Sequence, residues 1–105
     1  MIWGHPRLII HSCGGAFAPE NTLAGLRKAA ELGCRAVEFD VMLSADGTPV
    51  LIHDETLDRT TTGRGRVAAL DSATLVRLDA GIRHHPAFAG EPVPSFGDAA
   101  ELCLA

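Results

Sequence analysis

The fold of this 105-residue chain is decided by one stretch, Arg35-Ala36-Val37-Glu38-Phe39-Asp40-Val41-Met42-Leu43. Its apolar and acidic side chains alternate, which is typical of a β-strand whose successive residues face opposite sides of a sheet. Glu38 and Asp40 then share one face, and the apolar residues around them share the other. Two carboxylates this close repel each other unless a cation or protons intervene, and oxygen-rich sites suit Ca²⁺ or Mg²⁺. The alternative is a polar strand face that only meets solvent.

The residues before this stretch complete a strand–helix–strand unit. The apolar run at residues 7–10 predicts a buried strand. Leucines and alanines at helical spacing predict a helix from about residue 20 to 32, with Asn21 or Thr22 near its N-terminus and Gly33 at its C-terminal cap. A strand, a helix and a second strand in this order are typical of the start of an α/β fold in which the two strands pair in parallel.

The residues after this stretch predict a hairpin and then two further helices. Asp46-Gly47 is a strong turn signal, and a third strand follows at residues 49–53. Polar residues 54–66 predict a loop, and residues 70–78 a short helix capped by Asp71 or Ser72. After a second loop at residues 84–94, Ser95 is expected to cap a last helix that ends near residue 104.

Two histidines, His11 and His53, each end an apolar run that predicts a strand. Functional groups gather at the carboxyl ends of strands in parallel α/β architectures. The hairpin turn would bring His53 near Asp40. Two imidazoles at one site suit an acid–base pair near neutral pH. The alternative is two structural histidines whose hydrogen bonds are satisfied at the strand ends.

Other candidates have ordinary explanations. His84-His85 lies in a loop and is expected at the surface. Cys13 could supply a nucleophilic thiol, but packing of small residues explains it as well. The run Gly63-Arg64-Gly65-Arg66 could cradle a phosphate, with Arg59 as an anchor for the same loop, although a solvated loop is the default.

Composition excludes several classes of protein. The formal net charge of −4 gives no general attraction to nucleic acid or to an anionic membrane. Three cysteines without a C-x-x-C pair argue against a disulfide framework, and favour a reducing, cytoplasmic location. The N-terminus does not have the pattern of a signal peptide, and no apolar run approaches the roughly 18 residues that a membrane span requires, so stable membrane insertion is not expected.

Taken together, these segments resemble the glycerophosphodiester phosphodiesterase family. The resemblance extends from about residue 8 to 66. Its motifs are His11 followed by Ala18-Pro19-Glu20-Asn21-Thr22-Leu23, then Val37-Glu38-Phe39-Asp40-Val41, Leu43-Ser44-Ala45-Asp46-Gly47, Pro49-Val50-Leu51-Ile52-His53-Asp54, and Arg59-Thr60-Thr61. Each motif alone is weak, but all of them occur in order and at the spacing of the family.

The resemblance implies a TIM-type (β/α) barrel, of which residues 1–105 are the partial, N-terminal portion. It implies that His11 and His53 are the catalytic acid and base, and that Glu38 and Asp40 bind a divalent cation, Ca²⁺ or Mg²⁺. The reaction would be hydrolysis of a small glycerophosphodiester to glycerol 3-phosphate and an alcohol. Four residues of the motifs are expected to support this site: Glu20, Asn21, Asp54 and Arg59.

The chain departs from the family in three respects. The family usually has arginine, which grips phosphate as a charged fork, at the position of Ser12, and often a polar residue at that of Met42. The chain also stops before the strand expected to supply a third acidic ligand, whereas a complete barrel needs about 200 residues. We therefore expect a piece of a longer protein, with little activity alone and an open barrel edge able to self-associate.

Two other functions stay open. A catalytically impaired relative could retain the scaffold as a binding module, which Ser12 and Met42 favour. A phosphodiesterase of the same fold could instead act on phospholipids, but the sequence has no clear amphipathic membrane patch to favour that substrate.

Overall fold

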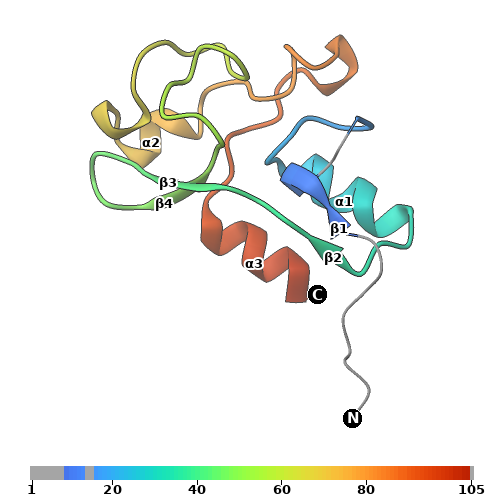
Figure 1. Cartoon of the computed structure of the whole chain (residues 1–105). Coiled ribbons are helices and arrows are strands. Elements are labelled where there is room, and N and C mark those ends of the chain that lie inside the picture. Colours follow the sequence, from blue (N-terminus) through green and yellow to red (C-terminus); the bar gives the residue numbers. More distant parts are fainter. Residues whose placement is uncertain (1–8, 14–15, 105) are drawn as a thin grey trace.

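The computed structural model describes residues 9–13 and 16–104 (Figure 1). Strand β1 (Ile9–Ile10) pairs in parallel with β2 (Ala36–Val37), and helix α1 (Leu23–Glu31) connects them. The predicted strand–helix–strand unit is therefore confirmed, while the first two residues of the strand predicted at 7–10 lie outside the described part.

Helix α1 begins later than predicted because Asn21 has a φ of 53°, which a right-handed helical turn does not allow. Thr22 is the N-cap, and its Oγ1 accepts a hydrogen bond from the Gly25 N–H at 3.1 Å. At the other end, Gly33 has a φ of 79° and donates its N–H to the Ala30 carbonyl. This is the C-terminal glycine cap that the sequence predicts.

The prediction of one continuous strand over residues 35–43 is wrong. The chain leaves β2 after Val37 and enters a second strand, β3 (Val41–Leu43), which pairs with β4 (Pro49–Leu51) in an antiparallel hairpin. Between the two strands, the Asp40 N–H donates to the side chain of Asn21 at 2.9 Å. Val41 is 42% exposed, so it does not belong to a buried apolar strand face.

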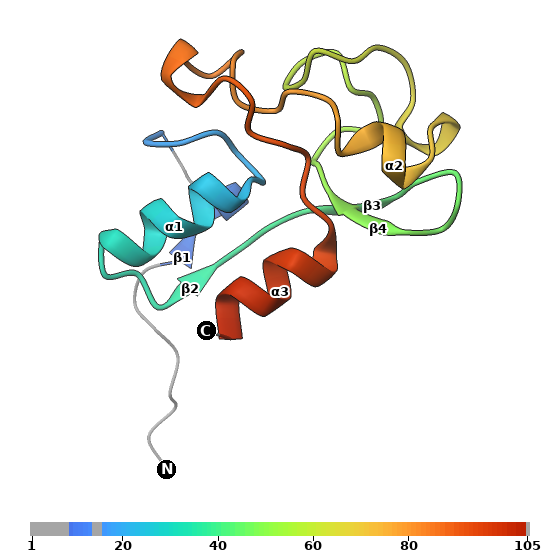
Figure 2. The same cartoon turned by 180° about the vertical axis from the view of Figure 1, so that it is seen from behind.

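Two apolar clusters meet at β4. The first contains Val50 and Ile52 and extends beneath the loops of residues 54–94, while the second contains Leu51 and extends between α1 and α3 (Phe96–Leu104). Because successive residues of a strand point to opposite faces, β4 contributes to both clusters. Figure 2 shows α1 and α3 as neighbours beside β2.

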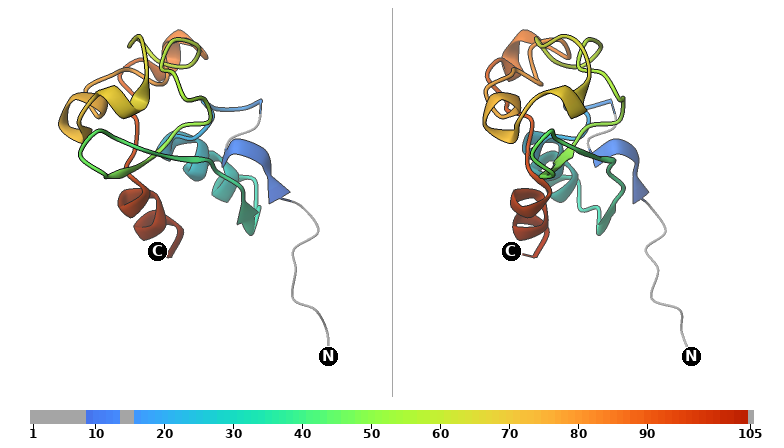
Figure 3. Two further views of the ribbon diagram at one scale, coloured as in Figure 1. Left: turned by 60° about the vertical axis from the view of Figure 1, so that its left-hand side comes forward. Right: turned by 90° about the vertical axis from the view of Figure 1, so that its left-hand side faces the viewer.

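The remaining elements follow the predicted order. The short helix α2 (Ser72–Leu75) is capped by Asp71, and Ser95 caps α3 by accepting the Asp98 N–H at 3.1 Å. Figure 3 shows the loops of residues 54–94 at one end of the molecule and α3 at the other. No helix in the described part of the chain is both long and apolar enough to cross a membrane.

Candidate functional site

The first histidine follows β1 directly, on a single 3₁₀ turn (His11–Cys13). Ser12, on the same turn, has φ 52° and ψ 29°, a left-handed conformation that is uncommon outside glycine. The turn faces Glu38: His11 Nε2 lies 3.5 Å from Glu38 Oε2, and the Ser12 N–H donates to Glu38 Oε1 at 3.4 Å. The carboxyl ends of β1 and β2 thus bring an imidazole and a carboxylate together, as a parallel pair should.

The second carboxylate, Asp40, is held by Asn21. The side chain of Asn21 is buried, and its Nδ2 donates to Asp40 Oδ2 at 3.1 Å, while its Oδ1 accepts the Asp40 N–H. Ser12 Oγ also lies 3.4 Å from Asp40 Oδ2. Asn21 therefore fixes both the backbone and the carboxylate of Asp40 next to the turn that carries His11.

The second histidine, His53, follows β4 and is part of a chain of charged groups. His53 Nδ1 lies 2.8 Å from Asp54 Oδ1. Arg59 donates from Nε and Nη2 to the two oxygens of Asp54, and from Nη1 and Nη2 to the two oxygens of Glu20. Arg59 thus joins two carboxylates by paired hydrogen bonds, one beside His53 and the other just before α1.

These contacts lower the pKa of the Asp54 carboxyl group and raise the pKa values of His53 and Arg59. The hydrogen bonds from Arg59, followed by that from His53, lower the pKa of Asp54 to about 2. The hydrogen bond to Asp54 and then the charge of Asp40 raise the pKa of His53 above its ordinary value. The bonds to Asp54 and Glu20 raise the already high pKa of Arg59. At neutral pH, Asp54 is therefore a carboxylate that accepts the proton of His53 Nδ1, which leaves Nε2 for other contacts.

A shallow hollow of about 300 Å³ joins the two histidines. Its lining residues are His11, Ser12, Glu20, His53 and Arg59. A larger hollow of about 550 Å³ lies between α1, β2 and α3, but it contains none of the predicted site residues. The two imidazoles therefore line one hollow, and Glu38 and Asp40, which do not line it, contact its lining residues His11 and Ser12.

The two carboxylates next to the turn of His11 and Ser12 have the donor chemistry of a divalent-cation site. Glu38 and Asp40 offer oxygen donors, which Ca²⁺ and Mg²⁺ prefer. Within residues 9–13 and 16–104, no group of three or more histidine, cysteine or acidic side chains is arranged to hold a metal ion. Because Ca²⁺ takes about six to eight oxygen ligands, further ligands have to come from elsewhere.

Several weaker candidates lie outside this arrangement. Arg59 does not anchor the 63–66 loop as predicted, since its hydrogen bonds go to Asp54 and Glu20. In that loop the Gly65 N–H donates to Asp58, so it does not serve a phosphate cradle in this structure. His85 caps a single turn by accepting the Ala87 N–H. The side chain of Cys13 lies outside the described part.

Arg83 lies near the site although no sequence motif predicts it there. Its side chain lines a second hollow of about 190 Å³, next to Arg59 and His84. A lone arginine in a loop carries no sequence signal, because only the fold of residues 79–91 brings it beside Arg59.

The fold and the site define a class: an α/β protein in which one histidine and one carboxylate follow the parallel strands β1 and β2, and a second histidine follows the hairpin strand β4. Comparison with known proteins makes the class specific. A model of the glycerophosphoryl diester phosphodiesterase family matches residues 11–105, and the chain belongs to this family. Members of the family are TIM-type barrels and generally depend on a metal ion, so the predicted fold class is confirmed.

Relatives and solved structures agree with this assignment. The chain is 44% identical over 95 residues to glycerophosphodiester phosphodiesterase of Caldanaerobacter subterraneus, covering 90% of this chain and 39% of the relative. It is 42% identical over 98 residues to the human glycerophosphodiester phosphodiesterase 1, covering 91% of this chain and 30% of the relative. The chain therefore spans less than half the length of these relatives.

Among solved structures, an Oleispira antarctica phosphodiesterase in complex with the product sn-glycerol-3-phosphate matches with a TM-score of 0.91 and 42% identity. The match covers 94% of this chain and 40% of that one. Glycerophosphodiester phosphodiesterase from Agrobacterium tumefaciens matches with a TM-score of 0.83 and 44% identity, over 89% of this chain and 41% of that one. The chain thus corresponds to the N-terminal part of these barrels.

Proposed function

We propose that residues 1–105 form the first part of a domain that hydrolyses glycerophosphodiesters to glycerol 3-phosphate and an alcohol. One observation carries the proposal: His11 and His53 line one hollow, and the carboxylates of Glu38 and Asp40 contact the turn that carries His11. The product bound to the Oleispira antarctica relative is consistent with this substrate class.

Glu38 and Asp40 are the residues that would hold a divalent cation, Ca²⁺ or Mg²⁺. When bound, the cation neutralises phosphate charge and stabilises the additional charge of the transition state. Asn21 and Ser12 position Asp40 for this role through the hydrogen bonds described above. The third acidic ligand is expected beyond the residues of this chain.

The two histidines would move the protons. In hydrolysis, a water oxygen forms a bond to phosphorus, the bond from phosphorus to the alcohol oxygen breaks, and the alkoxide takes up a proton. One imidazole accepts the proton of the water and the other donates to the alkoxide. Asp54 keeps His53 in the tautomer with its proton on Nδ1, and Arg59 keeps Asp54 ionised and in place.

Ser12 favours a second function, that of a catalytically impaired relative acting as a binding module. A serine hydroxyl cannot supply the positive charge that arginine gives to phosphate. In this structure, the Ser12 hydroxyl instead lies near Asp40 Oδ2 and His11 Nδ1.

Metal binding and hydrolysis separate these two functions. A chain extended to the length of the relatives, so that the third acidic ligand is present, is titrated with Mg²⁺ and with Ca²⁺ by calorimetry, and the release of glycerol 3-phosphate from its propyl diester is followed with each ion. The first function predicts that Glu38→Gln abolishes binding of the ion and that His53→Ala abolishes turnover, while Glu101→Gln, an exposed carboxylate on α3, changes neither. Binding of the ion by the extended chain without turnover favours the impaired module, and full turnover by its Glu38→Gln or His53→Ala variant refutes the assigned site.

Two further expectations belong to the same proposal. The described cysteines, Cys34 and Cys103, are free thiols, which supports a reducing, cytoplasmic location. Val41 and Leu43 on β3 are 42% and 59% exposed, which supports self-association of the chain through this open edge. Sedimentation of the wild-type chain and of Leu43→Lys tests the second expectation, because the charge should restore a monomer.

A further inference from the structure

A second hollow adjoins the hollow of the two histidines. Its volume is about 190 Å³, and its polar lining comes from Glu20, Arg59, Thr60, Arg83 and His84. Glu20 and Arg59 also line the first hollow. The two hollows therefore have the Arg59–Glu20 ion pair as a common wall.

The two arginines of the second hollow differ in their partners. The charge of Arg59 is compensated twice, by Asp54 and by Glu20. Arg83 donates from Nε to the Thr61 carbonyl oxygen at 2.5 Å, and in the described part of the chain no carboxylate pairs with it. The second hollow thus has a positive charge that is not compensated within residues 9–13 and 16–104.

The loop that carries Arg83 is held in shape before any ligand binds. The Asp79 carboxylate accepts the N–H groups of Gly81, Ile82 and Gly90 at 2.9, 2.9 and 2.7 Å. Partial burial opposes ionisation of Asp79, but the three donors outweigh it, so its pKa is lowered. Gly81 lies so close to the Phe88 carbonyl oxygen that an added Cβ would be 2.0 Å from it.

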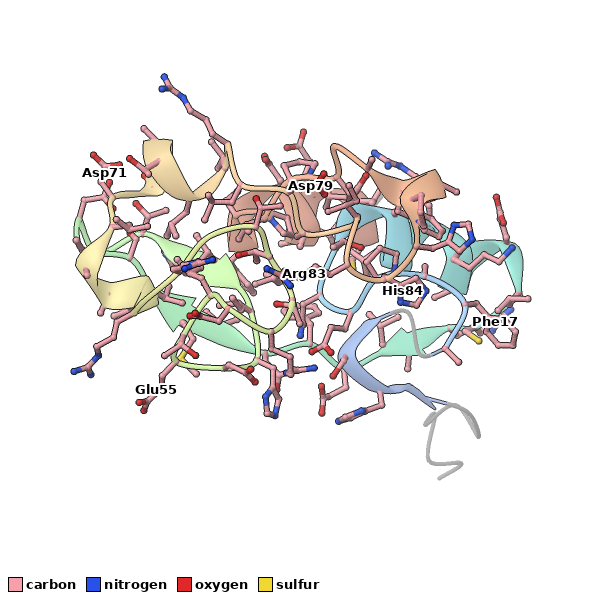
Figure 4. The ribbon with its side chains drawn as sticks, turned by 90° about the horizontal axis from the view of Figure 1, so that it is seen from above. Phe17, Glu55, Asp71, Asp79, Arg83 and His84 are labelled. Carbon is pink, nitrogen blue, oxygen red and sulfur yellow. The ribbon has the colours of Figure 1, made fainter. Side chains whose placement is uncertain are left out.

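Figure 4 shows how the labelled side chains are arranged from above. Arg83 lies over the middle of the molecule and His84 lies between it and Phe17, while Asp71 and Glu55 lie at the edge. His84 packs edge-on against Phe88, with ring centroids 5.7 Å apart. Both side chains are exposed to solvent, and both line the second hollow together with Arg59 and Glu20.

We propose that the second hollow binds the alcohol portion of the diester and selects alcohols that carry a negative charge, as a carboxylate or a phosphate. This inference rests on the proposed function, because the phosphodiester is placed at the histidines. The guanidinium of Arg83 offers charge-assisted hydrogen bonds to an anionic oxygen, and an ammonium group is repelled from the same place. The small volume suits a short polar alcohol and not an acyl chain.

The test compares three diesters of sn-glycerol 3-phosphate that differ only in the charge of a three-carbon alcohol: 3-hydroxypropionate, 1-propanol and 3-amino-1-propanol. Each is titrated into the full 105-residue chain in the presence of a chelator, and binding is followed by amide NMR shifts. We expect the 3-hydroxypropionate diester to bind about tenfold more tightly than the propyl diester, and the aminopropyl diester to bind most weakly. Equal affinities for the three, or no binding of the 3-hydroxypropionate diester, would overturn the inference.

Variants assign the preference to Arg83. Arg83→Gln should abolish the tenfold preference, and Arg77→Gln, an exposed arginine near α2, should leave it unchanged. Arg83→Lys retains the charge without the planar fork, so a reduced preference is expected. If Arg83→Gln does not fold, Arg83→Lys provides the test. An undiminished preference for the anionic alcohol in Arg83→Lys would refute a role for the planar guanidinium of Arg83.

The outcome is separable from that of the proposed function. Glu38→Gln should lose Mg²⁺ binding and leave the charge preference intact. A charge preference without hydrolysis contradicts the catalytic proposal alone. Hydrolysis without any charge preference contradicts this inference alone.

Discussion

Leu57 is the residue through which packing supports the candidate site. It lies between Asp54 and Arg59 in the chain, and its side chain is completely buried in the cluster beneath the loops. Its N–H donates to the Gly65 carbonyl, and its own carbonyl accepts the N–H and the hydroxyl of Thr61. We predict that Leu57→Ala destabilises the chain and loosens the loop that holds Asp54 against His53.

The size of the effect follows from the burial. The substitution removes three carbon atoms, each worth about 0.8 kcal/mol when buried, or about 2.4 kcal/mol of transfer free energy. The cavity that remains adds to this loss, so the free energy of unfolding should fall by about 3–4 kcal/mol. A chain of this length has a total of about 5–15 kcal/mol, so the variant should unfold at a clearly lower urea concentration.

Urea unfolding followed by far-UV circular dichroism measures this change, with Leu104→Ala as the matched control. Leu104 is 87% exposed, so the same substitution there should change stability by less than about 0.5 kcal/mol. NMR of the His53 ring in the folded Leu57→Ala variant reports on the loop. A loss below about 1 kcal/mol, or equal losses for the two variants, would refute the role of Leu57 in the core.

Three other predictions follow from single contacts. Asp54→Asn should lower the pKa of His53 towards its ordinary value, since the Asp54 carboxylate is the main cause of the raised pKa; an unchanged value in an NMR pH titration would exclude that cause. The pKa of Asp46 is lowered in the folded chain from 3.8 to about 2, first by the hydroxyl of Ser44 and then by that of Ser72. The ionised Asp46 carboxylate therefore stabilises the fold fully above pH 3.8, and this stabilisation is lost as the pH falls towards 2. The stability difference between wild type and Asp46→Asn should therefore shrink over that range of acid unfolding measurements, and a constant difference would contradict it. Gly81→Ala should lower the free energy of unfolding by about 2–3 kcal/mol in thermal unfolding, because the added Cβ has no room. Gly97→Ala within α3 should instead stabilise the chain by up to about 1 kcal/mol. Equal effects of the two substitutions would show that the loop of residues 79–91 shifts to accommodate the Cβ of residue 81.

The local parts of the fold could be predicted because their signals lie within a few residues. Thr22 and Gly33 mark the ends of α1, Asp46-Gly47 marks the hairpin turn, and Ser95 caps α3. Each of these residues either accepts a hydrogen bond from a nearby backbone N–H or allows the backbone to turn. Its effect therefore does not depend on distant segments.

The break in the predicted strand at residues 38–40 could not be predicted in this way. At this break Asp40 is held by Asn21, which is 19 residues away and donates and accepts hydrogen bonds with Asp40. Alternation alone predicts a continuous strand, because it takes no account of a partner elsewhere in the chain. The same break allows the chain to pass from the parallel pair to the hairpin that carries His53.

By itself, the sequence determined the family, the order of the elements, and the identity of the histidines and carboxylates at the strand ends, since all of these depend on residue types at close spacing. Only the tertiary structure decided how those groups meet: that Arg59 bridges Asp54 to Glu20 and not to its own loop, and that Arg83 comes to lie beside it. The physical reason is that the strength of a charged contact depends on distance in space, and the distance between Arg59 and Glu20 is set by packing around Leu57 and α1, not by the 39 positions that separate them.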